Sequence, residues 1–440
     1  FNVRRISLFG QDTWAVAPGL EVMFGAQYHA VWLPESNWNE SLAWDSLGAT
    51  GADSISRATS WGTRVGFVWD VAERNRSFVR GSLGLFFEEV DPVVLHEALT
   101  GDGRALTRAS RSNLDGWPSS PGSALTVPSV SLLGPEALEL PRTARGSFGL
   151  LPIEPAGTDQ FGRPVFGQLQ KMGGLVVPRL TLNRRFADLG RVYAINGDGW
   201  SQYVGGTFAL ERRGAPLDLS VSYTYSQTED NLIGARDGLP SARLDPNLDG
   251  EGGEPWGEGI SDFDVPHRVV ASVGLHLPVL EGGVLSGVFR FRSGYPFTPG
   301  FRPGVDPNGD GSGSNDPAFL GGVDLAGLEA SWDCLTGQPS GPVERNSCRG
   351  DPVHGLDLSL RLGIVRVGGA VAELTVDAVN LIEPEVGIRD RALYLVDSSQ
   401  PLSTVAGDVT IPLTANPGFG EFLRRLDPGR YVRVGVRIGR

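Results

Sequence analysis

Two acidic segments carry the residues best suited to holding a metal ion. The segments are LDPNLDGEGGE (244–254) and DPNGDGSGSND (306–316), and each contains Asp-x-Asn-x-Asp followed by Gly. The oxygen-bearing side chains at alternate positions are Asp245, Asn247, Asp249, Asp306, Asn308 and Asp310. Because this spacing turns carboxylate and amide oxygens towards one point, it suits a hard cation such as Ca²⁺.

Neither segment is an EF-hand, because the position of the EF-hand's bidentate Glu is taken by Trp256 in one and by Pro317 in the other. A smaller calcium site would have to be completed by Glu254, by Asp316 or by backbone carbonyls. The alternative is a solvated, turn-rich loop, where Asp, Asn and Gly serve local hydrogen bonds and positive φ angles. The sequence leaves both interpretations open.

The two cysteines, Cys334 and Cys348, lie in one long polar connection. Two cysteines fit neither a zinc site nor a disulfide-rich scaffold. In an oxidising compartment we expect them to form a disulfide, with two free thiols as the alternative.

The sequence offers no support for an enzyme or for a nucleic-acid-binding protein. The five histidines are scattered, and no H-E-x-x-H or G-x-S-x-G motif occurs. The net charge of −13 leaves no basic surplus for phosphate backbones. We therefore expect neither catalysis nor a nucleic-acid partner.

The elements that would position these residues follow from an alternation of apolar and polar residues. In LDLSVSYTYS (217–226) every odd position is apolar or aromatic and every even position is polar. Similar segments occur at 3–14, 20–29, 61–71, 77–90, 199–212, 267–277, 284–295, 354–365, 371–381 and 430–440. Period-2 alternation predicts β-strands with one apolar and one polar face. The count is eleven strands, or thirteen if 174–183 and 189–196 form a further pair.

The strands and their connections favour a membrane barrel over a soluble antiparallel sandwich. The strands are long, and short turns alternate with long polar connections. The long connections are 33–60, 91–172, 228–263, 296–353 and 383–429. Tilted strands of about 9–11 residues cross an apolar layer, and outer-membrane barrels have short turns on one side and long loops on the other. The prediction is an all-β, antiparallel transmembrane β-barrel with long extracellular loops.

In such a barrel the apolar side chains face lipid and the polar side chains face the lumen. The arginines expected to face the lumen are Arg290, Arg292, Arg361, Arg433 and Arg437. They would contact either an acidic plug or an anionic ligand, or they would simply form a wet polar wall.

The alternation of short and long connections also predicts strand direction. It makes the first and the last strand run the same way, towards the periplasm, which gives an odd number of strands. A complete single-chain bacterial barrel has an even number. We therefore expect this chain to be part of a larger barrel.

Several sequence segments at the ends of the expected strands resemble those of the barrel of TonB-dependent outer-membrane receptors. The resemblance is greatest to the Oar-like group of these receptors. The segments include ISLFGQDTWAVAPGLEVMFGAQYH (6–29), LDLSVSYTYSQTEDN (217–231), DFDVPHRVVASVGLHLP (262–278) and AELTVDAVNLI (372–382). The resemblance covers most of the chain at strand edges, but not 91–172. It implies the C-terminal portion of a barrel of 22 strands, spanning 1–440, without the plug and N-terminal domain.

The resemblance implies an integral protein of the bacterial outer membrane that binds and imports an extracellular ligand. The implied partners are outer-membrane lipid and lipopolysaccharide, the TonB complex acting through the plug, and a surface lipoprotein or other outer-membrane subunits. The alternatives are a passive channel or a structural or adhesive barrel, and a secreted β-sandwich that binds a ligand. Two departures are the short 183–200 region and the final Arg440, where the family usually ends in an aromatic residue.

Overall fold

The computed structural model describes sixteen parts of the chain. They are residues 4–32, 57–71, 77–85, 157–165, 168–178, 201–230, 258–278, 283–309, 313, 316–321, 323–325, 327–328, 332–367, 370–382, 386–426 and 429–439. A search of these parts for a helix with the length and hydropathy needed to cross a membrane finds none.

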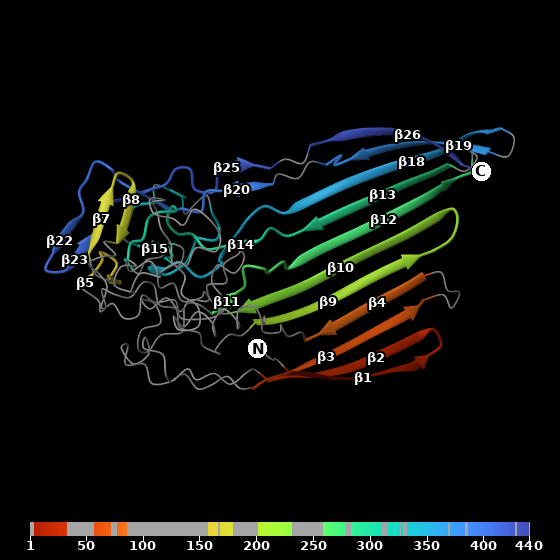
Figure 1. Cartoon of the computed structure of the whole chain (residues 1–440), viewed down its shortest axis with the longest axis horizontal. Helices are drawn as coiled ribbons and strands as arrows, with labels where there is room; N and C mark the ends of the chain where they lie inside the picture. Colours follow the sequence, from red (N-terminus) through yellow and green to blue (C-terminus); the bar gives the residue numbers. More distant parts are fainter. Residues whose placement is uncertain are drawn as a thin grey trace, which may run out of the picture.

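One antiparallel sheet dominates the molecule (Figure 1). Its long strands are β1 (Arg4–Ala17), β2 (Leu20–Trp32), β3 (Arg57–Asp70), β4 (Ser77–Gly84), β9 (Ser201–Arg212), β10 (Leu217–Asp230), β12 (His267–Leu277), β13 (Gly283–Arg292), β18 (Val353–Val367), β19 (Ala370–Val379) and β26 (Tyr431–Gly439). They are hydrogen-bonded in this order, and the short β11 (Gly259–Ile260) pairs with β10. Each of the eleven strands expected from the alternation is present.

The strands run up and down, and all long connections leave the same end of the sheet (Figure 1). That end is called the loop end here, and the other is called the turn end. β1 and β26 both run from the loop end to the turn end, as predicted. Among the described residues β1 pairs only with β2 and β26 only with β19, so the sheet is open at both edges.

The described part of the further strand pair expected at 174–183 and 189–196 does not join this sheet. β8 (Leu175–Pro178) instead pairs with β7 (Leu169–Met172) in a separate hairpin. Residues 189–196 lie outside the described parts.

The register brings the apolar positions of all the long strands onto one face. One row of directly paired residues is Trp14, Val22, Phe67, Gly81, Phe208 and Tyr223. A second row is Leu217, Leu275, Leu285, Leu360, Val376 and Val434. A slip of one residue between any two strands would break such rows, because it moves every side chain to the opposite face.

This apolar face is exposed rather than buried against a second layer. On β26, Val432, Val434 and Val436 are 67%, 65% and 64% exposed. A β-sandwich would bury such a face against its second sheet. The interpretation as a secreted sandwich is therefore wrong, and the arrangement is that of a sheet whose apolar side faces lipid.

A second unit lies at the loop end and consists of short two-stranded sheets (Figure 1). It is called the loop domain here and comprises the described residues of 157–178, 294–350 and 386–426. Besides β7 and β8, its strands are β5 (Gly157–Thr158), β6 (Pro164–Val165), β14 (Pro296–Phe297), β15 (Phe319–Leu320), β16 (Gly341–Pro342), β17 (Cys348–Arg349), β20 (Gly387–Arg389), β21 (Tyr394–Val396), β22 (Ser403–Val405), β23 (Asp408–Thr410), β24 (Leu413–Ala415) and β25 (Phe422–Arg425).

The loop domain has a hydrophobic core, although the sequence pattern suggested polar connections. All three of its chain segments contribute to this core. Its buried members include Val165, Val176, Phe297, Phe301, Leu320, Leu335, Val343, Leu393, Tyr394, Ile411 and Phe419. These residues follow neither a helical nor a strand period, so a search for periodicity cannot detect them.

The two faces of β10 provide a direct test of the lipid-facing assignment. Val221 lies on the apolar face opposite Leu210 and Ala271, and its neighbour Ser222 lies on the polar face. We expect Val221→Arg to lower the free energy of unfolding by about 2–4 kcal/mol, because arginine near the bilayer midplane is costly. The control Ser222→Arg should have a much smaller effect. Urea titration of the protein folded in lipid vesicles measures both, and equal losses would contradict the assignment.

Candidate functional site on the polar face and in the loop domain

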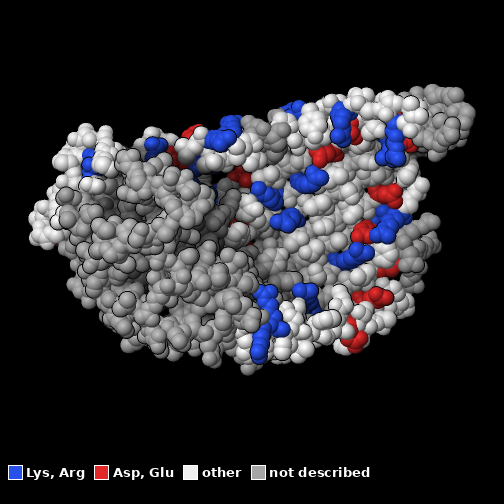
Figure 2. Space-filling view, viewed as in Figure 1, with Lys and Arg blue, Asp and Glu red and all other residues white. Residues whose placement is uncertain are grey.

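The polar face of the main sheet carries ion pairs between neighbouring strands. They are Arg80–Glu211, Arg290–Asp357 and Arg433–Asp377, each with a nitrogen–oxygen distance of 2.9 Å. On the same face the His276 side chain is hydrogen-bonded to Asp218 at 3.0 Å. Figure 2 shows basic and acidic side chains distributed over the strands on this face. The polar face is thus a charged surface, and each acidic group named here is bonded to an arginine or a histidine on a neighbouring strand.

All five arginines expected to face the lumen lie on this polar face. Arg290 and Arg433 have the carboxylate partners just named. Arg361 lies opposite Thr375 and interacts electrostatically with Asp377. Arg437 lies opposite Glu373.

The fifth of these arginines, Arg292, lies opposite a residue that was not singled out from the sequence, Arg268. The alternation of β12 places Arg268 on the polar face, but its pairing with Arg292 depends on the register of two strands. That register could not be read from the sequence alone.

The loop domain is held to the main sheet by a buried ion pair. Arg345 Nη2 lies 2.6 Å from the carboxylate of Asp230, the last residue of β10, and both side chains are 3% exposed. Arg345 Nη1 also donates to the Asp230 carbonyl. Nearby, Arg349 bonds the Asp264 carboxylate at 2.7 Å. Asn346 donates to the Ile260 carbonyl. These contacts fix residues 345–349 against the connection between β10 and β12.

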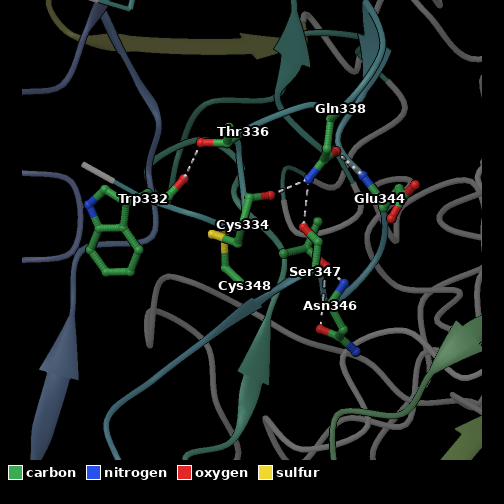
Figure 3. Close-up of a disulfide and its surroundings, with 9 residues drawn as sticks. Trp332, Cys334, Thr336, Gln338, Glu344, Asn346, Ser347 and Cys348 are labelled. Carbon is green, nitrogen blue, oxygen red and sulfur yellow. Dashed lines mark hydrogen bonds between the residues drawn. A yellow bond between two sulfur atoms is a disulfide. The ribbon is translucent and has the colours of Figure 1, made fainter. Parts of the chain in front are cut away.

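A disulfide joins Cys334 to Cys348 in the same part of the loop domain (Figure 3). Gln338 lies inside the closed loop, where its side-chain amide donates to the Cys334 carbonyl and to Ser347 Oγ. The Gln338 side-chain oxygen accepts from the Glu344 backbone N–H. The covalent link and these hydrogen bonds together define the conformation of the residues that precede Arg345.

An aromatic cluster packs beside the disulfide. Trp332 lies 5.0 Å from Phe419 and 6.3 Å from Phe297, measured between ring centroids. Gly420 permits this contact, since a Cβ at that position would meet the Trp332 ring at 1.8 Å. Gly420 also has a φ of +79°, which a residue with a side chain rarely adopts.

The residues of the acidic segments that the structure describes are buried in the loop domain. Asp306 is 6% exposed and accepts a hydrogen bond from the Gly309 N–H, while Asn308 is completely buried. The interpretation as a solvated loop therefore does not hold for these two residues. Asp245, Asn247, Asp249, Asp310 and Glu254 lie outside the described residues.

Calcium binding by these segments stays a prediction. Within the described residues no group of three or more His, Cys, Asp or Glu side chains is arranged to hold a metal ion. Asp316 was considered as a further ligand, but its carboxylate lies 3.8 Å from Arg163 Nη1. A guanidinium at that distance disfavours a second cation at the same carboxylate.

Arg163 is the centre of a buried polar and aromatic cluster. Its Nε donates to Asp159 at 2.7 Å, and its side chain is 2% exposed. The guanidinium carbon lies 4.8–5.6 Å from the ring centroids of Phe161, Phe301 and Phe319. Cation–π attraction of this kind is strongest where water is excluded. The cluster thus ties the 157–165 segment to the 294–350 segment.

Asp390 makes a comparable link between two other parts of the loop domain. Burial raises the pKa of its carboxyl group, but hydrogen bonds from Asn416 and Arg302 outweigh burial and hold the pKa below its usual value. The carboxylate is therefore ionised at neutral pH and joins residue 302 to residues 390 and 416.

Comparison with protein families identifies the class of fold. A family model described as "Outer membrane beta barrel domain" matches residues 155–383. The chain belongs to this family. It is thus an integral protein of the outer membrane, with the apolar face of its sheet towards lipid. The matched residues include the central strands and two of the three segments of the loop domain.

Solved structures of outer-membrane proteins also match over nearly the whole chain. The outer membrane transporter YddB from Escherichia coli is 8% identical, with a TM-score of 0.37, and the match covers 99% of this chain and 54% of that one. For the copper transporter OprC the identity is 10%, the TM-score is 0.30, and 99% and 47% of the two chains are covered. The chain therefore spans about half the length of these proteins. No curated protein matches.

The disulfide should stabilise the loop domain and not the membrane sheet. The Cys334→Ser, Cys348→Ser double variant should lose about 3 kcal/mol in the loop domain, because the bridge closes a loop of 14 residues. We expect faster proteolysis of the loop domain, with the heat-modifiable gel mobility of the barrel unchanged. In the native protein, alkylation without reductant should label neither cysteine. Labelling of both would contradict the disulfide.

The ion pair between Arg345 and Asp230 should control the docking of the loop domain. Arg345→Met leaves the buried Asp230 carboxylate without that guanidinium, at a cost of about 3–5 kcal/mol. We expect proteolytic cleavage of the loop domain to accelerate, and the double variant Arg345→Met, Asp230→Asn to recover part of the loss. The control Arg433→Met removes a more exposed pair on the sheet and should leave the cleavage rate unchanged. An equal effect of the control would argue against a docking role.

Proposed function

We propose that this outer membrane β-barrel is part of a TonB-dependent transporter that binds an extracellular ligand and imports it. The observation that carries the proposal is the loop domain. Segments from three separate connections build one hydrophobic core at the loop end of the sheet, where a passive pore would need an open mouth. A folded unit at this place suits a protein that captures a specific ligand before transport.

The size of the sheet supports the same proposal. In the part of the chain that the structure describes, the sheet of eleven long strands is open at both edges, and in this proposal further strands close the barrel. Barrels of 16–18 strands form water-filled porins, whereas barrels of 22 strands form transporters whose lumen is filled by a plug. In this proposal the closed barrel belongs to the wider class, and the charged polar face of the sheet is its inner wall.

In this proposal the polar face of the main sheet forms the inner wall of the barrel. It faces a plug domain that is contributed by a part of the protein outside this chain. TonB would act through that plug, and lipopolysaccharide would surround the outer part of the barrel. A surface lipoprotein or another outer-membrane subunit would contact the loop domain. The alternatives are a passive channel and a structural or adhesive barrel, which need neither energy coupling nor a plug.

Electrical recording separates a plugged transporter from a passive channel. The full-length protein, reconstituted into a planar lipid bilayer in KCl solution, should show no stable open conductance. Deletion of the plug should open a large conductance, and the purified periplasmic domain of TonB should bind the intact protein. A steady open conductance of the intact protein, without TonB binding, would favour the passive channel.

A further inference from the structure

Two arginines face each other across neighbouring strands on the polar face. Arg268, near the start of β12, is directly paired with Arg292, the last residue of β13. Like charges at directly opposite positions repel each other and destabilise a sheet. The pair is also unexpected because the chain as a whole carries a net charge of −13.

Nothing in the described residues neutralises this pair. Within these parts of the chain Arg268 is exposed and has no hydrogen bond or ion pair. The Arg292 guanidinium lies 4.4 Å from the centroid of the Tyr295 ring and makes a long hydrogen bond of 3.4 Å to the Ser293 carbonyl. Neither contact supplies a negative charge.

The carboxylates at this end of the sheet are already engaged elsewhere. Asp357 accepts from Arg290, which lies on the same strand as Arg292. Asp264 is paired with Arg349, and Asp230 is paired with Arg345. Of the three arginines Arg268, Arg290 and Arg292, only Arg290 has a carboxylate partner among the described residues, so an excess of positive charge remains.

Among the described residues, no side chain fills the position next to Arg290 on β18. Gly355 lies opposite Arg290 on the polar face, and a Cβ at Gly355 would meet no atom within 4 Å. Figure 2 shows basic side chains gathered over the loop ends of β12, β13 and β18. The glycine at 355 thus leaves the Arg290 guanidinium without a side-chain neighbour at that position of β18.

We propose that Arg268 and Arg292, with Arg290 beside them, bind an oxyanion of the transported ligand, either a carboxylate or a phosphate. Adjacent strands lie about 4.8 Å apart, so one oxyanion can accept hydrogen bonds from both guanidinium groups at once. Arginine presents a planar set of donors that matches the geometry of carboxylate and phosphate. A bound oxyanion also removes the repulsion between the two arginines.

The inference rests on the proposed transport function, because it names the chemical class of the ligand. It predicts that an anionic solute is attracted to the loop end of the inner wall, although the chain as a whole is acidic. The bound group would lie on the sheet at the boundary with the loop domain. Arg349 and Arg345, which hold the loop domain, lie in the same region but are occupied by their own carboxylates.

Calorimetric titration of the full-length protein in detergent micelles tests the site, with citrate and inorganic phosphate as probes. We expect at least one probe to bind, with an affinity that falls as salt rises. Arg268→Gln and Arg292→Gln should each weaken binding at least tenfold. The control Arg437→Gln, on the same face at the turn end, should bind like the native protein. Absence of binding to the native protein, or equal losses in all three variants, would overturn the proposal.

Thermal unfolding provides a second readout that a purely structural role would not produce. Without a probe, Arg268→Gln should unfold at the same temperature as the native protein or higher, because the repulsion with Arg292 is gone. With a probe, the native protein should be stabilised and Arg268→Gln should not. A lowered unfolding temperature of Arg268→Gln, together with an unchanged response to both probes, would show that the arginine is structural. Neither measurement depends on transport. A finding that the protein imports no ligand would contradict the proposed function, but it would not contradict the oxyanion site.

Discussion

Every backbone N–H and C=O group in an apolar layer has to find its partner within the protein, because lipid offers none. In this protein the antiparallel pairing of eleven long strands meets that demand within the described sheet, except along the outer edges of β1 and β26. The pairing also fixes the register, and the register places most apolar positions on one side and most charged positions on the other. The lipid-facing surface, the ion pairs of the inner wall and the opposed Arg268 and Arg292 are all consequences of the same hydrogen-bonded ladder.

The loop domain follows a different physical rule. Its strands are short, and its stability comes from a mixed core that includes Phe297, Tyr394 and Phe419. The disulfide, the Arg163 cluster and Asp390 join segments that are distant in sequence. At its base the buried pair of Arg345 and Asp230 connects this core to the end of β10. The membrane sheet therefore serves as the fixed platform on which the loop domain is assembled.

The strands could be predicted because their signal is local. Alternation in segments such as 217–226 and 371–381 indicates both the strand and the face of each residue, which is why the polar face of the sheet could be predicted for Arg290 and Arg433. The loop core could not be predicted, since residues such as Phe301 and Leu393 have no periodic pattern and meet only in the folded protein. The sequence also could not show that Arg268 lies opposite Arg292, because cross-strand pairing depends on turn geometry and register.

The loop domain combines two kinds of link that differ in the length of chain they span. Cys334 and Cys348 are close in sequence, so their bond can form while the rest of the chain is still unpaired. The core instead unites residues from 165 to 419 and requires the intervening strands to be in place. The disulfide therefore depends only on a short stretch of chain. The core joins a segment that precedes β9 to a segment that follows β19, so an intact core requires the strands between them to lie side by side.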